Sequence, residues 1–285
     1  MFFIKFRTII IYIAILSLFL TLSGLYIIAP KTQHTSSGES IEVPIIMYHS
    51  VLKDKNKSGK FVITPDDFEA DLKFLKENGY TPIFMSDLIN FVNNKSDLPK
   101  KPIILTFDDG YYNNYLYVLP LLKKYNMKSV ISIVGIYTDL YSQNEDKSAE
   151  YAHLDWDTVN EMMNSGLIEF QNHSYNLHTM DNGRNGSKKK IGESQNEYEK
   201  MLSYDLTLLQ TEFLEHTGYT PTVYTYPFGA VSKASYDIIK KLGFVSTLSC
   251  ENKTNYISPG DTEALYMLNR FIRPASKSLQ SILKK

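Results

Sequence analysis

Two adjacent carboxylates have the residue types and the setting for hydrolytic chemistry. Asp108 and Asp109 follow the apolar run Ile103–Phe107, and Gly110 comes directly after them. Neighbouring side chains of an extended chain point in opposite directions, so the pair cannot easily flank a sugar bond as glycosidase carboxylates do, about 5–9 Å apart. A division of labour fits better, with one carboxylate on a metal ion and the other taking a proton from water. An ordinary Asp-Asp-Gly surface turn is the alternative.

A second candidate group is the histidine pair His173 and His178. On a helix, five residues rotate the chain by about 500°, which would leave the rings roughly 140° apart on different faces. The pair can therefore meet at a metal ion only if His173 ends a strand and His178 lies in the following loop. Two histidines and one carboxylate, with positions open to water and substrate, form a reasonable hydrolytic metal site. Each histidine could instead be an ordinary loop residue.

The elements that must position these residues alternate between strand and helix. Thr64 is expected to cap one helix, with Pro65 in its first turn, and Ser86 to cap the next. The expected strands are 43–48, 102–107, 129–134, 168–170, 222–226, 244–248 and 265–272, and the expected helices are 65–78, 86–92, 115–125, 155–163, 196–216 and 233–242. This order predicts an α/β fold with a parallel sheet, and about seven units favour a distorted (β/α) barrel over residues 43–285.

In such barrels the chemistry lies where the strands end. His49, Asp108, His173 and Pro227 each follow or end an expected strand. We therefore expect them to share one pocket, with Tyr111 at its rim.

Composition excludes several classes of protein. The 285 residues carry 30 lysines and arginines against 31 aspartates and glutamates, a net charge of −1 that gives no reason to expect nucleic-acid binding. Apolar residues make up 43%, enough to form a core. The single cysteine, Cys250, excludes an internal disulfide framework and a cysteine-rich zinc site, and we expect it to be a small buried apolar residue. Any bound metal must therefore be held by nitrogen and oxygen.

The N-terminal segment has the length and composition of a membrane anchor. Residues 9–29 are uncharged and mostly apolar, and as a helix they would span about 30 Å. Positive residues before them predict a cytoplasmic N-terminus, residues 1–8, and residues 30–42 read as a polar linker. The expected location is the cell membrane, with a single span and an extracellular catalytic domain. A cleaved signal peptide, and hence a secreted protein, is the alternative.

Four motifs together resemble the polysaccharide deacetylases (carbohydrate esterase family 4, NodB-type). Residues 106–110 (TFDDG) match the family signature, residues 172–178 (NHSYNLH) its second motif and residues 225–229 (TYPFG) its third. Residues 47–50 (MYHS) resemble the tyrosine-histidine motif of the branch that de-N-acetylates poly-N-acetylglucosamine in biofilms. The likeness covers roughly residues 43–273, and the five-residue histidine spacing resembles the same branch.

The resemblance implies roles for individual residues. Asp109, His173 and His178 would bind a divalent metal, with zinc as the first expectation and cobalt, nickel or manganese as alternatives. Asp108 would be the general base, and the backbone N–H of Phe228, which follows Pro227, would help to hold the oxyanion.

Two further roles are expected where the chain departs from the family pattern. The motif-three arginine found in many members is missing, and Arg270 is expected to orient the base in its place. The chain has no histidine after His216, so the late histidine that supplies the acid in other members is also missing. His49 is expected to act as the acid instead.

The expected function is that of a metal-dependent hydrolase that removes N-acetyl groups from an extracellular N-acetylglucosamine polymer and releases acetate. Poly-N-acetylglucosamine is favoured as the substrate over peptidoglycan, and O-acetylated glycans such as xylan come third. A non-catalytic glycan-binding surface protein on the same scaffold is an alternative from a different class.

Overall fold

The computed structural model describes residues 39–284 of the chain. The predicted cytoplasmic N-terminus, the predicted membrane segment 9–29 and most of the predicted linker lie outside these residues. β1 (Ile41–Val43) begins within the last residues of that linker. Within residues 39–284 no helix has both the length and the apolar character needed to cross a membrane.

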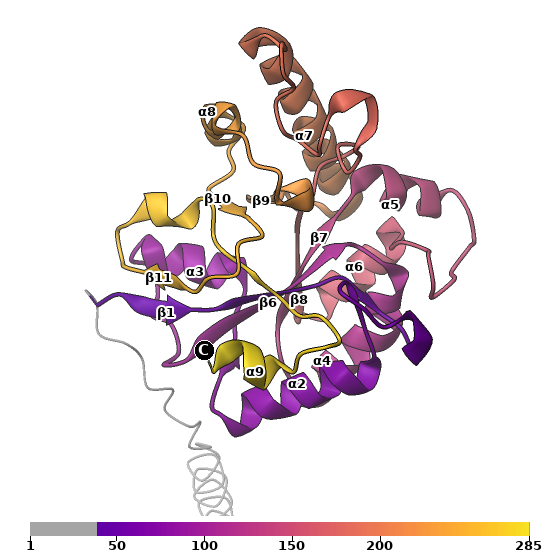
Figure 1. Cartoon of the computed structure of the whole chain (residues 1–285), viewed down its shortest axis with the longest axis vertical. Helices are drawn as coiled ribbons and strands as arrows, with labels where there is room; N and C mark the ends of the chain where they lie inside the picture. Colours follow the sequence, from indigo (N-terminus) through magenta and orange to yellow (C-terminus); the bar gives the residue numbers. More distant parts are fainter. Residues whose placement is uncertain (1–38, 285) are drawn as a thin grey trace, which may run out of the picture. The chain divides into compact units, whose positions relative to one another are not determined.

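A curled sheet of parallel strands lies at the centre of the fold (Figure 1). In the described part of the chain its main path runs β10-β9-β8-β7-β6-β2-β12, and β5 pairs with β6 as an eighth strand. The strands are β2 (Ile45–Tyr48), β5 (Thr81–Pro82), β6 (Pro102–Asp109), β7 (Ser129–Ile133), β8 (Ile168–Asn172), β9 (Val223–Thr225), β10 (Ser246–Leu248) and β12 (Phe271–Ile272). The predicted α/β class and parallel sheet are therefore confirmed.

Closure of the barrel is only partial. The ends of the main path meet at an isolated bridge between Leu248, in β10, and Leu268, in the segment leading to β12. The N–H of Ser249 donates to the carbonyl of Leu268 at 2.8 Å, which strengthens this contact. The sheet is therefore curled toward a barrel, without a full ladder between β10 and β12.

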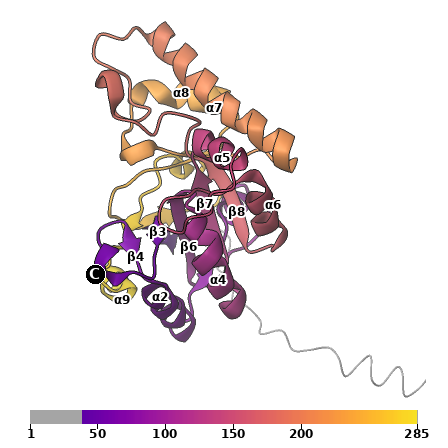
Figure 2. The ribbon, with the colours of Figure 1, turned by 90° about the vertical axis from the view of Figure 1, so that its right-hand side faces the viewer.

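Helices cover the sheet, and Figure 2 shows α7 beside α8 on one side of the molecule and α2, α4 and α9 on another. The α-helices are α2 (Pro65–Glu77), α3 (Met85–Val92), α4 (Leu119–Tyr125), α5 (Gly135–Ser142), α6 (Trp156–Asn164), α7 (Gln195–Thr217), α8 (Tyr236–Lys241) and α9 (Leu279–Leu283). A π-helical turn, η2 (Asn114–Val118), precedes α4, and 3-10 turns occur at η1 (Lys55–Lys57), η3 (Asp181–Gly183), η4 (Pro227–Gly229), η5 (Lys233–Ser235) and η6 (Thr262–Leu265). Two small sheets pair β1 with β11 (Asn255–Ile257) and β3 (Ser50–Val51) with β4 (Val62–Ile63).

Local signals set the starts of several helices. The Thr64 hydroxyl accepts a hydrogen bond from the N–H of Asp67 at 3.1 Å, and the Asp67 carboxylate accepts from the N–H of Thr64 at 3.0 Å. This capping box confirms the predicted start of α2. The predicted cap at Ser86 is wrong, because α3 already begins at Met85 and the Asp87 carboxylate accepts the N–H of Phe84.

Several predicted strands are shorter than expected, and two of them have a clear local cause. Pro44, which has no N–H, separates β1 from β2 within the predicted strand 43–48. The predicted strand 265–272 is reduced to β12, because Leu265 ends a 3-10 turn and Met267 has a φ of 63°. No sequence pattern predicted α5, α9 and the short strands β3, β4, β5 and β11.

The core lies on both faces of the sheet. All eight residues of β6 are buried, as is typical of a parallel strand covered on both sides. This double burial keeps the end of β6 rigid, and β6 ends on the two carboxylates identified in the sequence.

Candidate metal-dependent active site

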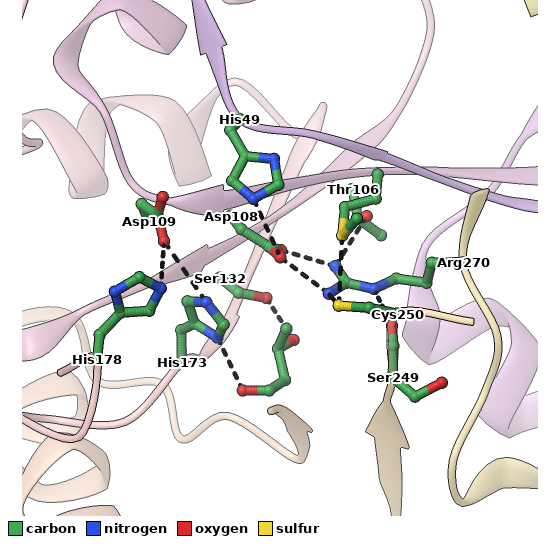
Figure 3. A network of polar contacts seen from close by, with 12 residues as sticks. His49, Thr106, Asp108, Asp109, Ser132, His173, His178, Ser249, Cys250 and Arg270 are labelled. Carbon is green, nitrogen blue, oxygen red and sulfur yellow. Dashed lines mark hydrogen bonds and ion pairs between the residues drawn. The ribbon is translucent and has the colours of Figure 1, made fainter. Parts of the chain in front are cut away.

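The two carboxylates at the end of β6 point to different sides of the strand. Figure 3 shows Asp109 facing His173 and His178, while Asp108 faces Arg270. Asp109 and Gly110 both have a φ of 72°, in the left-handed region that non-glycine residues rarely adopt. A Cβ at position 110 would lie 2.8 Å from the Ile133 side chain, so only glycine fits this turn.

Asp109, His173 and His178 come together as a set of three ligand atoms. Asp109 Oδ1 lies 3.5 Å from His173 Nε2 and 3.2 Å from His178 Nε2. One atom from each residue lies within 4.8 Å of the others, which suits a shared metal ion. His173 follows the last residue of β8 and His178 lies in the next loop, as the five-residue spacing predicts.

The surroundings of this triad fit a metal ion. His173 Nδ1 lies 2.8 Å from the carbonyl of Thr225, at the end of β9. A carbonyl can only accept, so Nδ1 carries a hydrogen and Nε2 is the nitrogen left to bind a metal. Burial opposes the charged form of His173, but contact with Asp109 raises the pKa of His173, and a bound cation would take the place of the proton on Nε2. The buried Oδ1 of Asp109 has no hydrogen-bond partner within residues 39–284. A buried carboxylate oxygen without a hydrogen bond is costly, and a cation between the three side chains would remove that cost.

The charge of Asp109 also suits a metal ligand. Burial alone would raise the pKa of Asp109, but its contact with His173 and the nearby charges of His49 and His178 hold that pKa well below its usual range. Burial in turn lowers the pKa of His178. A deprotonated carboxylate and a neutral imidazole are the forms that bind metal.

Asp108 is held by a buried arginine. Arg270 Nη1 lies 2.7 Å from Asp108 Oδ1 and Nη2 lies 2.8 Å from Oδ2, a bidentate pair. Arg270 is fully buried, and its Nε donates to the carbonyl of Ser249 at 2.7 Å. Burial favours the neutral form of Asp108, but Arg270 outweighs it and holds the pKa of Asp108 below its usual value. Asp108 is thus a charged, fixed carboxylate that lies beside the metal triad without joining it.

His49 lies on the other side of Asp108. Its Nε2 is 4.0 Å from Asp108 Oδ2, and its ring contacts that of Phe61 with centroids 4.6 Å apart. The buried Nδ1 has no hydrogen-bond partner in the described part of the chain. Burial lowers the pKa of His49, and the charges of Asp108 and Asp109 oppose this shift.

These side chains line one cleft of about 390 Å³. Its lining residues are Met47, His49, Ser50, Lys60, Phe61, Val62, Asp108, Asp109, Tyr111, His173, His178, Phe228, Cys250, Asn252 and Ile272. Tyr111 lines the cleft as the sequence predicts. Phe228 also lines it, with a φ of 57° and its ring centroid 4.2 Å from that of His178. Pro227 is buried.

The structure adds cleft residues that sequence reasoning missed. Cys250 is not simply a small core residue, because its Sγ lies in the cleft lining, 3.6 Å from Arg270 Nη2. Its place just after β10 is the signal that could have found it, since other cleft residues also follow strand ends. Lys60 and Phe61 follow no such pattern, and no signal in the sequence marks them.

Two further segments pack against residues of the cleft. The ring of His153 lies 4.8 Å from that of Tyr111, and burial lowers the pKa of His153 to about 4. The loop 181–190 is partly anchored. Ser187 is fully buried, and a Cβ on Gly186 would lie 2.8 Å from the Pro227 carbonyl.

The chain is similar in sequence to curated proteins. The chain is 26% identical over 220 residues to the poly-β-1,6-N-acetyl-D-glucosamine N-deacetylase of Escherichia coli (strain K12). The aligned region covers 70% of this chain and 32% of that protein. The chain thus spans about a third of that relative's length. It is also 22% identical over 209 residues to the protein of the same name from Staphylococcus aureus (strain MSSA476), covering 73% of this chain and 67% of that one.

Solved structures share the fold. A de-N-acetylase from Aggregatibacter actinomycetemcomitans superposes with a TM-score of 0.73 at 25% identity, over 86% of this chain and 99% of that one. IcaB from Ammonifex degensii superposes with a TM-score of 0.67 at 24% identity, over 84% and 94%. The polysaccharide deacetylase family model matches residues 95–246, more than half of the chain. The chain belongs to the polysaccharide deacetylase family.

Proposed function

We propose that this protein is a metal-dependent N-deacetylase of an N-acetylglucosamine polymer of the poly-β-1,6-N-acetyl-D-glucosamine type, which it hydrolyses to release acetate. The observation that carries the proposal is the placement of Asp109, His173 and His178 around one point, with Asp108 held separately by Arg270 in the same cleft. Glycan binding alone needs no fixed carboxylate beside a metal site. The names of the relatives from E. coli and S. aureus support the choice of polymer.

The cleft offers a group for each proton transfer. Asp109, His173 and His178 would hold a divalent ion, which would supply Lewis acidity toward the acetamide carbonyl and lower the pKa of water. Asp108 accepts the proton of the attacking water, and Arg270 keeps its carboxylate charged and oriented. His49, 4.0 Å from Asp108, acts as the acid in its protonated form, which the nearby carboxylates of Asp108 and Asp109 favour, and gives this proton to the leaving sugar amine. The N–H of Phe228 donates to the carbonyl oxygen as negative charge develops there.

The proposal also covers the identity of the metal and the cellular location of the enzyme. One oxygen and two imidazole nitrogens suit zinc in a three-ligand site that leaves a position open, and cobalt, nickel and manganese are the alternatives. The uncharged segment 9–29 supports a membrane-anchored enzyme whose cleft faces the extracellular polymer. Peptidoglycan is the alternative polymer, and it is an outcome of the test that follows.

The test is acetate release by the full-length chain in detergent. We expect release from poly-β-1,6-N-acetyl-D-glucosamine that exceeds release from purified peptidoglycan, is lost with a chelator and returns with zinc. Asp108→Asn should lower turnover by about 10²–10⁴-fold while metal content stays at the wild-type level, because Asp108 is not a ligand. Asp146→Asn, the same change on an exposed loop residue, is the control.

Three results would contradict the proposal in different parts. Near-normal turnover by Asp108→Asn would remove Asp108 from the base role. Faster release from peptidoglycan would reassign the polymer. Metal-independent binding of the polymer without any acetate release would indicate a glycan-binding protein instead.

A further inference from the structure

The two histidines of the candidate metal site are held in different ways. His173 directly follows β8, and the Thr225 carbonyl fixes its ring, 2.8 Å from Nδ1. His178 lies in the loop beyond, and within residues 39–284 its ring has no hydrogen bond to a neighbouring strand. Its Nε2 nevertheless lies 3.2 Å from Asp109 Oδ1. The place of His178 therefore depends on the path of residues 174–177.

One carboxylate outside the cleft holds this loop. Asp205, in α7, accepts the N–H of Tyr175 with Oδ1 and the N–H of Asn176 with Oδ2, both at 2.8 Å. Its side chain is buried, and in the described part of the chain it forms no ion pair. Burying a carboxylate without a cationic partner is costly, and these two hydrogen bonds offset that cost. The two oxygens thus fix two successive peptide groups between the histidines.

The loop needs such support because its backbone is strained. Ser174 has a φ of 75°, in the left-handed region that residues other than glycine rarely adopt. A strained backbone persists only where the surrounding structure holds it. At the start of α5, the N–H of Gly135 donates to the Ser174 carbonyl at 3.1 Å, and the next N–H, of Ile136, donates to the Tyr175 carbonyl at 2.9 Å. The start of α5 thus holds the carbonyls of the loop, and Asp205 holds its N–H groups.

We propose that Asp205 is a positioning residue of the metal site, which fixes the loop that carries His178 and thereby raises the affinity for the metal ion. The inference rests on the proposed function, because it takes Asp109, His173 and His178 as the metal ligands. Asp205 does not line the cleft, so it acts through the loop alone. Groups that orient metal ligands typically change metal affinity by about 10–100-fold when they are lost.

The test measures the Kd of zinc by competition with a chromophoric chelator, on the metal-free full-length chain in detergent at pH 7.5. Asp205→Asn keeps the shape of the side chain, but its amide nitrogen cannot accept, so one of the two hydrogen bonds is lost. We expect the Kd of zinc to rise by about tenfold. In a His178→Ala background the same substitution should change the Kd by less than about twofold, because the ligand that Asp205 positions is already gone.

Asp71→Asn is the matched control, because it also changes a buried aspartate but lies in α2, away from the loop with His178. It should lower the stability of the fold and leave the Kd of zinc near the wild-type value. The cobalt-loaded protein gives a second readout, since its visible absorption depends on the coordination geometry. This spectrum should change in Asp205→Asn and stay as in the wild type in Asp71→Asn.

Other outcomes decide the inference equally clearly. An unchanged Kd of zinc in folded Asp205→Asn overturns the positioning role while the deacetylase proposal stands. An equal rise in the His178→Ala background also overturns it, because Asp205 would then act through another group. If Asp205→Asn does not fold, Asp205→Glu takes its place, since it keeps two acceptor oxygens but moves them by one methylene group, and the same dependence on His178 is expected. A wild-type chain that binds no divalent metal contradicts the proposed function itself.

Discussion

Asp108 and Asp109 are neighbours of the same chemical type in opposite environments. Asp109 faces two imidazoles and keeps a buried oxygen without a hydrogen bond, whereas both oxygens of Asp108 accept from Arg270. Successive side chains of β6 point to opposite sides of the strand, which separates the two carboxylates, and the left-handed backbone at Asp109 keeps them apart. Environment rather than residue type thus assigns the two candidate roles, of metal ligand and base.

His49 is expected to affect the rate of deacetylation without affecting metal binding. Its ring contacts Asp108 and not the ligand atoms of the triad, so His49→Ala should lower kcat by about 10²-fold or more, the range for a lost general acid. Acetate release and metal content measured on one preparation check this. Loss of metal in His49→Ala would instead make His49 a ligand. His216→Ala, outside the cleft lining, is the control.

Arg270 is expected to act through its planar, forked geometry rather than through its charge alone. Arg270→Lys keeps the charge but cannot make the two parallel hydrogen bonds to Asp108. Because a small misplacement of a catalytic group is costly, we expect kcat to fall by about 10²-fold with KM and metal content little changed. Arg184→Lys, in the ion pair with Glu193, is the matched control. Full activity in Arg270→Lys would show that charge alone is sufficient.

At the scale of elements, β12 is held at both ends by buried arginines. This strand has two residues, and the arginines on either side of it, Arg270 and Arg273, contact the carboxylates of Asp108 and Asp71. The Tyr48 hydroxyl also donates to Asp71 at 3.1 Å, which ties the residue before His49 to the same group. The two pairs fix the register of a strand that is too short to fix it by its own ladder.

Breaking the Asp71–Arg273 pair should destabilise the fold. Asp71→Asn leaves Arg273 buried without its carboxylate, and loss of one partner of a buried pair costs about 3–5 kcal/mol. Urea unfolding followed by circular dichroism measures the change in the free energy of unfolding. Asp67→Asn, a partly exposed capping residue of the same helix, should cost less, about 1 kcal/mol. Equal losses in the two variants would contradict a special role for the buried pair.

At the scale of the whole molecule, parallel strands place the carboxyl ends of distant segments at one edge. His49, Asp108 and His173 follow or end β2, β6 and β8, and Arg270, in the segment before β12, contacts Asp108. The curl of the sheet, with its bridge between Leu248 and Leu268, brings the last of these segments near the others. The cleft is therefore a product of topology rather than of any single loop.

Stability of the whole fold should depend on pH through Asp205 of α7. Burial raises the pKa of Asp205 to about 6, against two backbone N–H donors at 2.8 Å that favour the charged form. The folded state therefore holds a proton that the unfolded chain, with a pKa of about 3.9, releases earlier. The bound proton adds at most about 3 kcal/mol to the free energy of unfolding. This contribution is fully present below about pH 3.9 and is lost as the pH rises through about 6.

The matched variant isolates this contribution. Asp205→Asn cannot titrate, so its free energy of unfolding should change less between pH 4 and pH 6 than that of the wild type. Urea titrations at half-unit pH steps measure the two slopes. Parallel slopes would show that Asp205 titrates alike in the folded and unfolded states.

Local patterns in the sequence were enough to predict the strand-helix order, the cap at Thr64 and the placement of His173 at a strand end with His178 in the next loop. These features depend on residues within a few positions of one another, where periodicity, capping and turn preferences act. The same patterns led to a cap at Ser86 that is wrong, and to a last strand that is too long.

Only the tertiary structure decided which distant groups meet. The Asp71–Arg273 pair and the contact of Cys250 with Arg270 join residues that are 202 and 20 positions apart. Local preferences carry no information about such contacts, because they depend on how the sheet curls and how the helices pack against it.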